Sequence, residues 1–237
     1  MVNCVESVPK LNLCRAYNLG IIEYEQARQL QNNLVSARIA GDIPDIALLL
    51  QHHPVLTIGA SGNEQNILTS QERLASKGIP VIRTDRGGDV TYHGPGQLVG
   101  YLIFDLKTHG TGLHQYVRRL EEVIIRTLNH FSITAHRDPQ YPGVWVRHAK
   151  ICALGIRVSR WVTKHGFALN VNTDLKHFTG IIPCGIADRR ATSMAQVLGH
   201  EIALEEVASC LCEQCAWVFH INISEKPAEE LIGYYVR

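Results

Sequence analysis

Residues Arg86–Tyr101, which read RGGDVTYHGPGQLVGY, decide the prediction of the fold. The stretch holds five glycines and one proline, and it lies between two apolar runs, Pro80–Ile82 and Leu98–Phe104. Glycine lets the backbone bend sharply and lets another group approach the main chain closely. We therefore predict a binding loop, carrying Arg86 and His93, between two buried strands. An ordinary glycine-rich hairpin connection is the alternative interpretation.

The same stretch argues against the two familiar nucleotide loops. It does not fit G-x-G-x-x-G, and it lacks the Gly-Lys-Ser/Thr ending of a P-loop. A phosphate cradle of either kind is therefore disfavoured.

Composition describes a globular chain without a strong overall charge. Its 237 residues are 46% hydrophobic and 19% charged, and the formal net charge is +1. Such a balance creates no bulk attraction to nucleic acid or to a membrane surface. Seven scattered cysteines and an N-terminus without a signal pattern indicate thiols in a reducing compartment. We expect a cytoplasmic protein.

Hydrophobic periodicity predicts helices and strands in alternation, without repeats or linkers. One domain over residues 1–237 is the simplest organisation. The predicted helices cover residues 23–38, 70–77, 113–131 and 204–219. Besides the two runs that flank the glycine-rich stretch, the predicted strands cover residues 46–50, 55–58, 133–135, 144–146, 150–158 and 166–171.

Two groups of possible metal ligands are disfavoured, the histidines by geometry and the cysteines by the number of ligands. His52 and His53 are neighbours on a predicted strand, so their side chains point to opposite faces. Cys212 and Cys215 form a CxxC pair, but no second pair completes four ligands. We expect no metal site.

Cys184 has the setting of a reactive thiol. Pro183 stiffens the backbone before it and Gly185 frees the backbone after it, so a loop here can present the sulfur. A thiol needs a nearby cation to ionise at neutral pH. Lys150, at the start of an apolar strand, is a candidate for that cation, with an ordinary surface charge as the alternative.

Four blocks then resemble one family. They are RGGDVTYHGPGQ, Lys150–Gly155 (KICALG), His165–Asp174 (HGFALNVNTD) and Ile182–Gly185 (IPCG). Together they resemble the lipoyl(octanoyl) transferases of the biotin/lipoate protein ligase superfamily, and the match is strongest over residues 46–198. The resemblance implies an α/β fold of the α+β type, with mixed, largely antiparallel sheets flanked by helices in a single domain.

The resemblance also implies the site. Cys184 matches the nucleophile that holds the acyl group as a thioester, and Lys150 matches the lysine that lowers its pKa. The segments that match substrate-binding positions are Arg86, Gly87, Gly88, Asp89, Val90, Thr91, Tyr92 and His93, then Ala153, Leu154 and Gly155, then Gly166, Phe167 and Ala168. Asp89 departs from the family, in which Gln or Glu is frequent. For His93 we expect a positioning role, with proton transfer as the alternative.

The implied reaction moves an octanoyl group from octanoyl-acyl carrier protein to a lysine of a lipoyl domain, the first step of protein lipoylation. The acceptors are lipoyl domains of 2-oxoacid dehydrogenase E2 subunits and the glycine cleavage H protein. One thioester replaces another and an amide follows, so we expect no ATP, metal or other cofactor. Small residues at positions 155, 166 and 168 would leave a narrow slot for the acyl chain, or would merely permit tight strand packing.

Three alternatives stay open at this point: an octanoyl relay between lipoyl proteins, an ATP-dependent lipoate or biotin ligase, and a non-catalytic lipoyl- or metal-binding protein. A further hypothesis concerns docking of acidic partners. It assigns that surface to the basic residues Arg157, Arg160, Lys164, Arg189 and Arg190.

Overall fold

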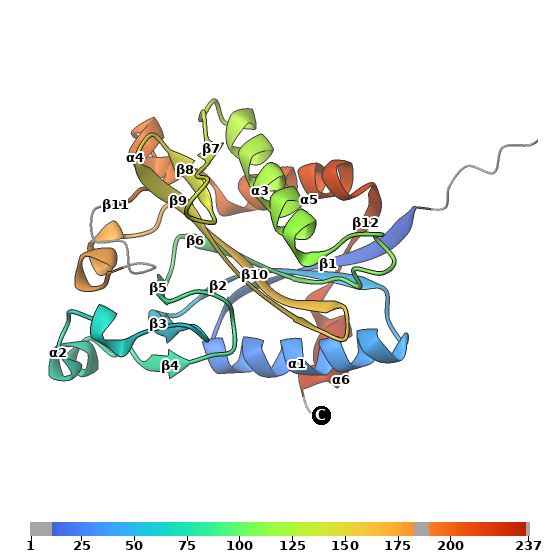
Figure 1. Ribbon diagram of the computed structural model, residues 1–237, viewed down its shortest axis with the longest axis horizontal. Helices are drawn as coiled ribbons and strands as arrows, with labels where there is room; N and C mark the ends of the chain where they lie inside the picture. Colours follow the sequence, from blue (N-terminus) through green and yellow to red (C-terminus); the bar gives the residue numbers. More distant parts are fainter. Residues whose placement is uncertain (1–10, 183–189, 236–237) are drawn as a thin grey trace, which may run out of the picture.

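The computed structural model describes residues 11–182 and 190–235 (Figure 1). Within them a nine-stranded sheet runs in the order β12-β1-β2-β6-β10-β9-β8-β7, and β11 pairs with β9. The pairs β1–β12, β1–β2 and β9–β11 are parallel, and the others in this sheet are antiparallel. Its strands are β1 (Asn12–Ile22), β2 (Asp45–His52), β6 (Gln97–Ile103), β7 (His136–Arg137), β8 (Val144–Val146), β9 (Ala149–Ser159), β10 (Val162–Asn170), β11 (Arg190–Ala191) and β12 (Ile221–Lys226).

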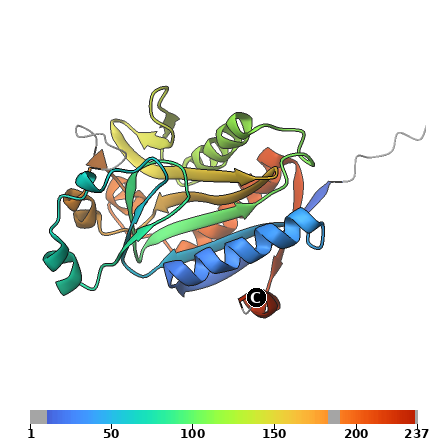
Figure 2. The same ribbon diagram turned by 60° about the horizontal axis from the view of Figure 1, so that its bottom comes forward.

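Helices cover both faces of this sheet (Figures 1 and 2). The helix α1 lies on one face, and α3 and α5 lie side by side on the other. The remaining helices are short: α2 and α4 lie at one end of the molecule, and α6 packs against α1. The helical segments are α1 (Tyr24–Ala40), η1 (Glu64–Asn66), α2 (Gln71–Ser76), α3 (Leu113–His130), η2 (Leu175–Gly180), α4 (Met194–Leu198), α5 (Leu204–Phe219), η4 (Ala228–Leu231) and α6 (Ile232–Tyr235).

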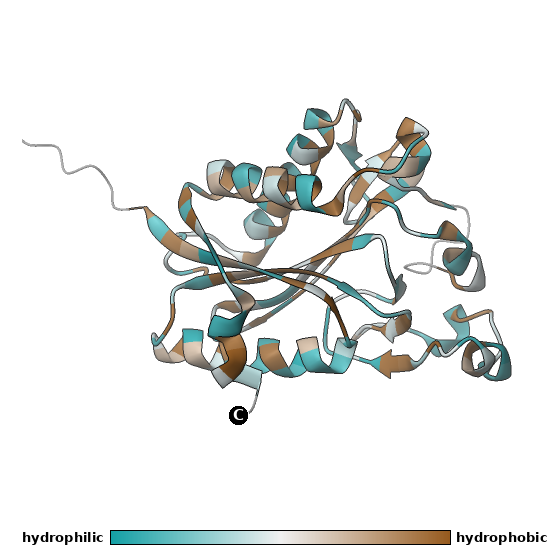
Figure 3. Ribbon diagram, turned by 180° about the vertical axis from the view of Figure 1, so that it is seen from behind, coloured by the Kyte–Doolittle hydropathy of each residue, from teal (hydrophilic) through white to brown (hydrophobic). Residues whose placement is uncertain are grey.

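The central strands contribute side chains to two hydrophobic cores, one on each face of the sheet. Along β2, Ala47 and Leu49 join the core under α3 and α5, whereas Leu48 and Leu50 join the core under α1. Alternate side chains of a strand point to opposite faces, so a strand between two helix layers is apolar throughout. Figure 3 shows these apolar stretches running along the central strands between the helix layers.

A small second sheet lies beside the main one. It has the order β4-β3-β5, with β3 (Val55–Ile58), β4 (Val81–Arg83) and β5 (Val90–His93). With α2 and Ile181 it forms a third apolar cluster. Because β3 follows β2 after only two residues, this sheet is attached directly to the end of a central strand.

The predicted fold class, mixed and largely antiparallel sheets flanked by helices, is confirmed, and the four predicted helices are present. Three local predictions are wrong. The strand at 80–82 is not buried, because β4 is an edge strand with Val81 38% exposed. No strand covers 133–135, and β7 begins at His136 instead. The glycine-rich stretch is not one loop, because Val90–His93 form β5, paired antiparallel with β3.

Candidate active site

Arg86 organises the glycine-rich stretch from inside. The side chain is buried, and its guanidinium makes five hydrogen bonds to acceptors on Thr57, Gly87 and Asp89. The two shortest of these bonds join Nη2 to carbonyl oxygens, that of Asp89 at 2.6 Å and that of Thr57 at 2.7 Å. The guanidinium therefore fixes the shape of the 86–89 loop against β3.

Asp89 anchors the same loop from the other side. One carboxylate oxygen accepts from the backbone N–H of Asn63 at 2.9 Å, and the other accepts from the side-chain amide of Asn66. Asp89 thus connects the loop to η1.

A small cavity lies between this loop and the hairpin of β9 and β10. Its volume is about 40 Å³, which is room for only a few water molecules. All the segments predicted to bind substrate meet at this cavity. Of the residues named in that prediction, all but Gly87 and Tyr92 line it. The lining residues are Tyr24, Arg86, Gly88, Asp89, Val90, Thr91, His93, Tyr101, Ala153, Leu154, Gly155, His165, Gly166, Phe167 and Ala168.

Glycine is required at two of these positions by backbone packing. A Cβ at Gly166 would lie 2.0 Å from the carbonyl oxygen of Gly100 on the paired strand β6. A Cβ at Gly155 would lie 2.9 Å from the carbonyl oxygen of Gly87. Tight packing therefore explains both glycines, and the same close approach keeps the cavity narrow.

His93 belongs to a buried chain of hydrogen bonds. Its Nδ1 lies 2.7 Å from Oε1 of Gln97, which requires the proton on Nδ1. Gln97 donates to Oδ1 of Asn170 at 3.0 Å, and Asn170 donates to the carbonyl of Thr192 at 3.0 Å. Burial holds the pKa of His93 well below its ordinary value. The imidazole is thus neutral near pH 7 and is fixed in orientation.

Sequence reasoning missed Tyr24, Tyr101 and His165 in the cavity wall. Tyr101 donates to Nε2 of His52 at 2.7 Å, and Nδ1 of His52 donates to the carbonyl of Ile22 at 3.0 Å. Burial lowers the pKa of His52 to about 4. Tyr101 and His165 stand at the edges of quoted blocks but were assigned no role, and Tyr24 lies in none of these blocks.

His165 adopts a strained backbone conformation at the cavity wall. Its φ is 63°, in the left-handed region that non-glycine residues rarely occupy. Its backbone N–H donates to Oε1 of Gln31 at 2.8 Å, and its Nε2 donates to Asp85 at 2.8 Å. Its buried Nδ1 has no hydrogen-bond partner among the described residues. Burial lowers the pKa of His165 to about 4, although the bond to Asp85 opposes this.

The carboxylate of Asp85 contacts three basic side chains, those of His165, Lys164 and Arg157. Lys164 Nζ lies 3.1 Å from both carboxylate oxygens, and Arg157 Nε lies 3.3 Å from one of them. Burial raises the pKa of Asp85, but the hydrogen bonds from His165 and Lys164 outweigh it and bring the value to about 2. Lys164 is itself buried. The hypothesis that Lys164 belongs to a docking surface is therefore wrong.

Lys150 lies at the start of β9, outside the cavity. Its Nζ is 3.2 Å from the carbonyl of Pro142 and 4.8 Å from the centroid of the Trp145 ring. The partner strand β11 sets Ala191 opposite Lys150, and the Thr192 N–H donates to the Lys150 carbonyl at 2.9 Å. The predicted nucleophile Cys184 lies outside the described residues, as does Arg189. The described chain ends before it at Ile182, whose N–H donates to the carbonyl of Asn66, and resumes at Arg190.

None of the described cysteines has the loop setting predicted for Cys184. Cys14, Cys152, Cys210, Cys212 and Cys215 are buried thiols. Burial raises the pKa of Cys212 to about 12, which disfavours the thiolate. His52 is buried and His53 is exposed, as expected for strand neighbours. Among residues 11–182 and 190–235, no group of three His, Cys, Asp or Glu side chains could hold a metal ion.

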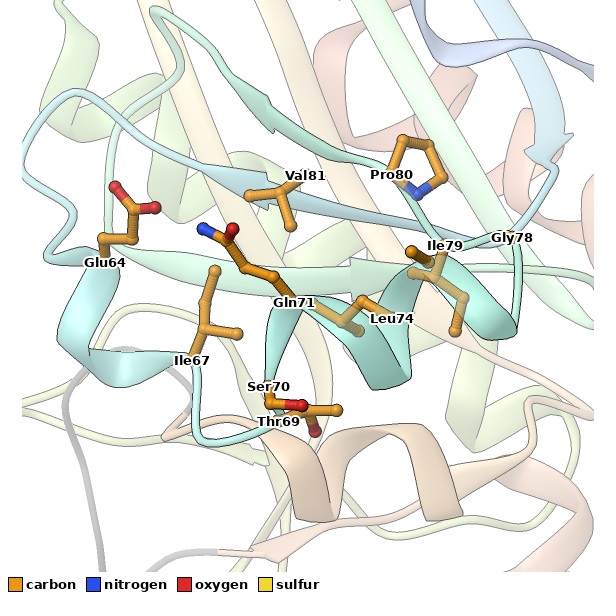
Figure 4. Close-up of a pocket in the computed structure, with 11 residues that line it drawn as sticks. Glu64, Ile67, Thr69, Ser70, Gln71, Leu74, Gly78, Ile79, Pro80 and Val81 are labelled. Atoms are coloured by element: carbon orange, nitrogen blue, oxygen red, sulfur yellow. The ribbon is translucent and has the colours of Figure 1, made fainter.

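Two larger hollows flank α2. One, of about 690 Å³, lies between α2 and β4 and is lined mainly by apolar side chains such as Ile67, Leu74 and Val81 (Figure 4). The other, of about 540 Å³, lies between α2 and η2. Tyr92, which does not line the small cavity, lines this second hollow and stacks on His177 with ring centroids 4.5 Å apart.

No helix in the described part of the chain is long and apolar enough to cross a bilayer.

Comparison with known proteins gives one consistent family. The model of the lipoyl protein ligase A/B catalytic domain matches residues 23–216. The octanoyltransferase of Caldicellulosiruptor saccharolyticus is 49% identical over 228 residues, which cover 94% of this chain and 96% of the relative. The octanoyltransferase of Koribacter versatilis is 48% identical over 212 residues, which cover 87% of this chain and 84% of the relative.

Solved structures agree on the fold. A lipoate-protein ligase A bound with ATP superposes with a TM-score of 0.77 at 16% identity, covering 93% of this chain and 92% of that chain. A biotin protein ligase from Aquifex aeolicus superposes with a TM-score of 0.50 at 14% identity, covering 87% of this chain and 69% of that chain. At these identities the likeness concerns the fold alone.

Proposed function

The chain belongs to the lipoyl protein ligase A/B catalytic domain family and is an acyltransferase that moves octanoyl groups in protein lipoylation, and from this premise we propose a two-step route through Cys184. Its acceptors are lipoyl-domain proteins. The proposal adds the donor, octanoyl-acyl carrier protein, the covalent intermediate and the roles of the side chains.

In the first step the Cys184 thiolate attacks the carbonyl carbon of the octanoyl thioester. A new C–S bond forms, the C–S bond to the carrier's phosphopantetheine breaks, and the released thiolate takes the proton of the Lys150 ammonium, which leaves Lys150 neutral. The Lys150 ammonium stabilises the attacking thiolate. Exchange of one thioester for another is nearly thermoneutral, so this step needs neither ATP nor a metal.

In the second step a lysine amine of the lipoyl domain attacks the acyl-enzyme. An amide C–N bond forms, the C–S bond to Cys184 breaks, and neutral Lys150 takes the proton from the attacking nitrogen. Conversion of a thioester to an amide is downhill. E2 subunits of 2-oxoacid dehydrogenases and the glycine cleavage H protein are the acceptors that we propose.

One observation carries the pairing of Cys184 with Lys150: the register that sets Ala191 opposite Lys150. The chain that contains Cys184 joins Ile182 to Arg190, and the strand that follows it is hydrogen-bonded directly to the lysine's own strand. The buried chain from His93 through Gln97 and Asn170 ends at Thr192 in the same place. It supports a positioning role for His93.

The octanoyl chain enters the cavity between the 86–89 loop and the β9–β10 hairpin. At about 40 Å³ the cavity is too small for eight carbons, so its wall must move when the chain binds. The wall segment Gly166–Ala168 is paired with strands on both sides, whereas the 86–89 loop belongs to no strand. The Arg86 and Asp89 side chains and a few backbone hydrogen bonds hold this loop. We propose that the loop is the wall that moves. We also place the reaction in the cytoplasm, to which five described free thiols are suited.

Intact-mass analysis tests the route. The protein mixed with octanoyl-acyl carrier protein should gain one octanoyl group, and the adduct should disappear in Cys184→Ala and persist in Cys212→Ala. An adduct that survives in Cys184→Ala would refute the nucleophile. ATP–pyrophosphate exchange would instead identify a ligase, and preference for an octanoylated lipoyl protein over the carrier would identify a relay enzyme.

A further inference from the structure

The hollow between α2 and η2 has the chemistry of an anion-binding cleft. Three cationic side chains line it: Arg73 and Lys77 from α2 and its end, and Lys176 from η2. The uncharged lining residues include the hydroxyl groups of Thr69, Ser70 and Thr179. No aspartate or glutamate is among its described lining residues.

The two walls of the cleft are tied together at its base. The backbone N–H groups of Leu68 and Thr69 donate to the carbonyl of Gly180 at 2.9 and 3.1 Å, and the Thr69 hydroxyl donates to the same oxygen at 3.3 Å. The stacked rings of Tyr92 and His177 close one side. The cleft is thus formed by packed elements and is not an open gap between mobile segments.

The cations of the cleft lack neutralising partners. In the described residues no carboxylate lies within 4.0 Å of the charged nitrogens of Arg73, Lys77 or Lys176. Among the lining residues, His177 has a carboxylate partner, Asp174, at 4.0 Å. Three like charges around one hollow repel each other, and an anion among them relieves that repulsion. The apolar hollow on the opposite side of α2, which carries Glu64, has no comparable set (Figure 4).

We propose that this cleft is the docking site of the acyl donor, where Arg73, Lys77 and Lys176 bind the phosphodiester of a phosphopantetheine arm and the acidic carrier surface around it. The inference rests on the proposed function. The donor's phosphopantetheine arm carries a phosphodiester, a fixed anion that the acceptor's lysine side chain lacks, and this anion favours the donor as the occupant. Position in the sequence agrees, since Ile181, which lines the cleft, precedes Cys184 by three residues.

Two donors and matched variants test the proposal. The rate at which the enzyme is acylated is measured with octanoyl-acyl carrier protein and with an octanoyl thioester of a short neutral thiol, for the wild type, Lys176→Glu and Arg73→Glu/Lys77→Glu. The control is Lys107→Glu, an exposed lysine on the connection between β6 and α3. All four side chains are exposed, so the variants are expected to fold.

At low salt we expect KM for the carrier-bound donor to rise about tenfold in each cleft variant and to keep its wild-type value in the control. KM for the neutral thioester should stay unchanged in all of them, and the salt dependence of the carrier reaction should weaken in the cleft variants. An unchanged KM for the carrier, an equal rise for both donors, or a rise confined to the lipoyl-domain acceptor would overturn the docking site. Failure of the wild type to be acylated by either donor would instead refute the proposed function.

Discussion

Acidification should lower the free energy of unfolding through His52, because protonation of its buried ring is unfavourable in the folded state. The ring lies in the core beside Tyr24 and Tyr101, and both of its nitrogens are engaged with neutral partners. Burial lowers its pKa to about 4, against 6.5 for an exposed histidine. As the pH falls through 6.5 the unfolded chain binds a proton first, so stability is lost between pH 6.5 and 4.

The size of the effect follows from these two values. For one group with pKa 6.5 unfolded and about 4 folded, proton linkage removes about 0.2 kcal/mol of stability at pH 7 and about 2.0 kcal/mol at pH 5. The loss attributable to His52 is therefore about 1.8 kcal/mol over two pH units. His165, whose pKa is also about 4, adds a loss of similar size.

Urea unfolding at pH 7 and pH 5 measures the effect, and a variant isolates it. His52→Gln can still donate and accept hydrogen bonds but does not titrate, so its stability should fall by about 1.8 kcal/mol less than that of the wild type. His53→Gln, with a half-exposed side chain one residue further on, should keep the full pH dependence. Equal losses in the wild type and in His52→Gln would refute the reasoning.

Three further perturbations test the site and its scaffold. Gly166→Ala places a Cβ 2.0 Å from the Gly100 carbonyl oxygen and should lower the free energy of unfolding in urea by about 3 kcal/mol. Gly233→Ala, whose Cβ would have no atom within 4 Å, should leave stability unchanged or raise it. Equal effects of the two variants would contradict the packing argument. Asp85→Asn removes the charge facing buried Lys164 and should cost about 2 kcal/mol, a loss that Lys164→Met in the same chain should reduce. Lys150→Met should slow single-turnover acylation of Cys184 at pH 7 by about a hundredfold while leaving the urea midpoint nearly unchanged, and wild-type acylation would exclude the dyad.

Periodicity predicted the elements whose burial is regular. The helices α1, α3 and α5 pack one apolar face each, and β2, β6 and β10 lie between two cores, so their patterns are visible in the sequence. The strand β1 was not predicted. Its register shifts between Asn18 and Ile21, where Gly20 has a φ of 62°, and the shift breaks the alternation that identifies a strand.

The glycine-rich stretch was predicted as a binding element, and the structure brings it against the Ala153–Gly155 and Gly166–Ala168 segments. Its internal order was not predicted, because Arg86 and Asp89 make their hydrogen bonds to Thr57, Asn63 and Asn66, which no spacing rule connects to them. Lys164 was misassigned for the same reason. Nothing in a linear sequence shows that Asp85, far away in the chain, neutralises it.

The strand β9 holds the parts of the site at fixed spacing. It carries Lys150 at its start, the cavity residues Ala153–Gly155 further along, and Ile156, whose carbonyl accepts from the N–H of Gly87 at 3.3 Å. At roughly 3.3 Å per residue, Lys150 and Ala153 are about 10 Å apart along the strand. The pairing of Lys150 with Trp145 and of Ala153 with Ala168 fixes this backbone spacing, so only the side chain of Lys150 can bring its Nζ closer to the cavity. In the proposed binding mode, adjustment to the length of an acyl chain therefore falls to the 86–89 loop, which belongs to no strand and is held by the Arg86 and Asp89 side chains and the Gly87 N–H.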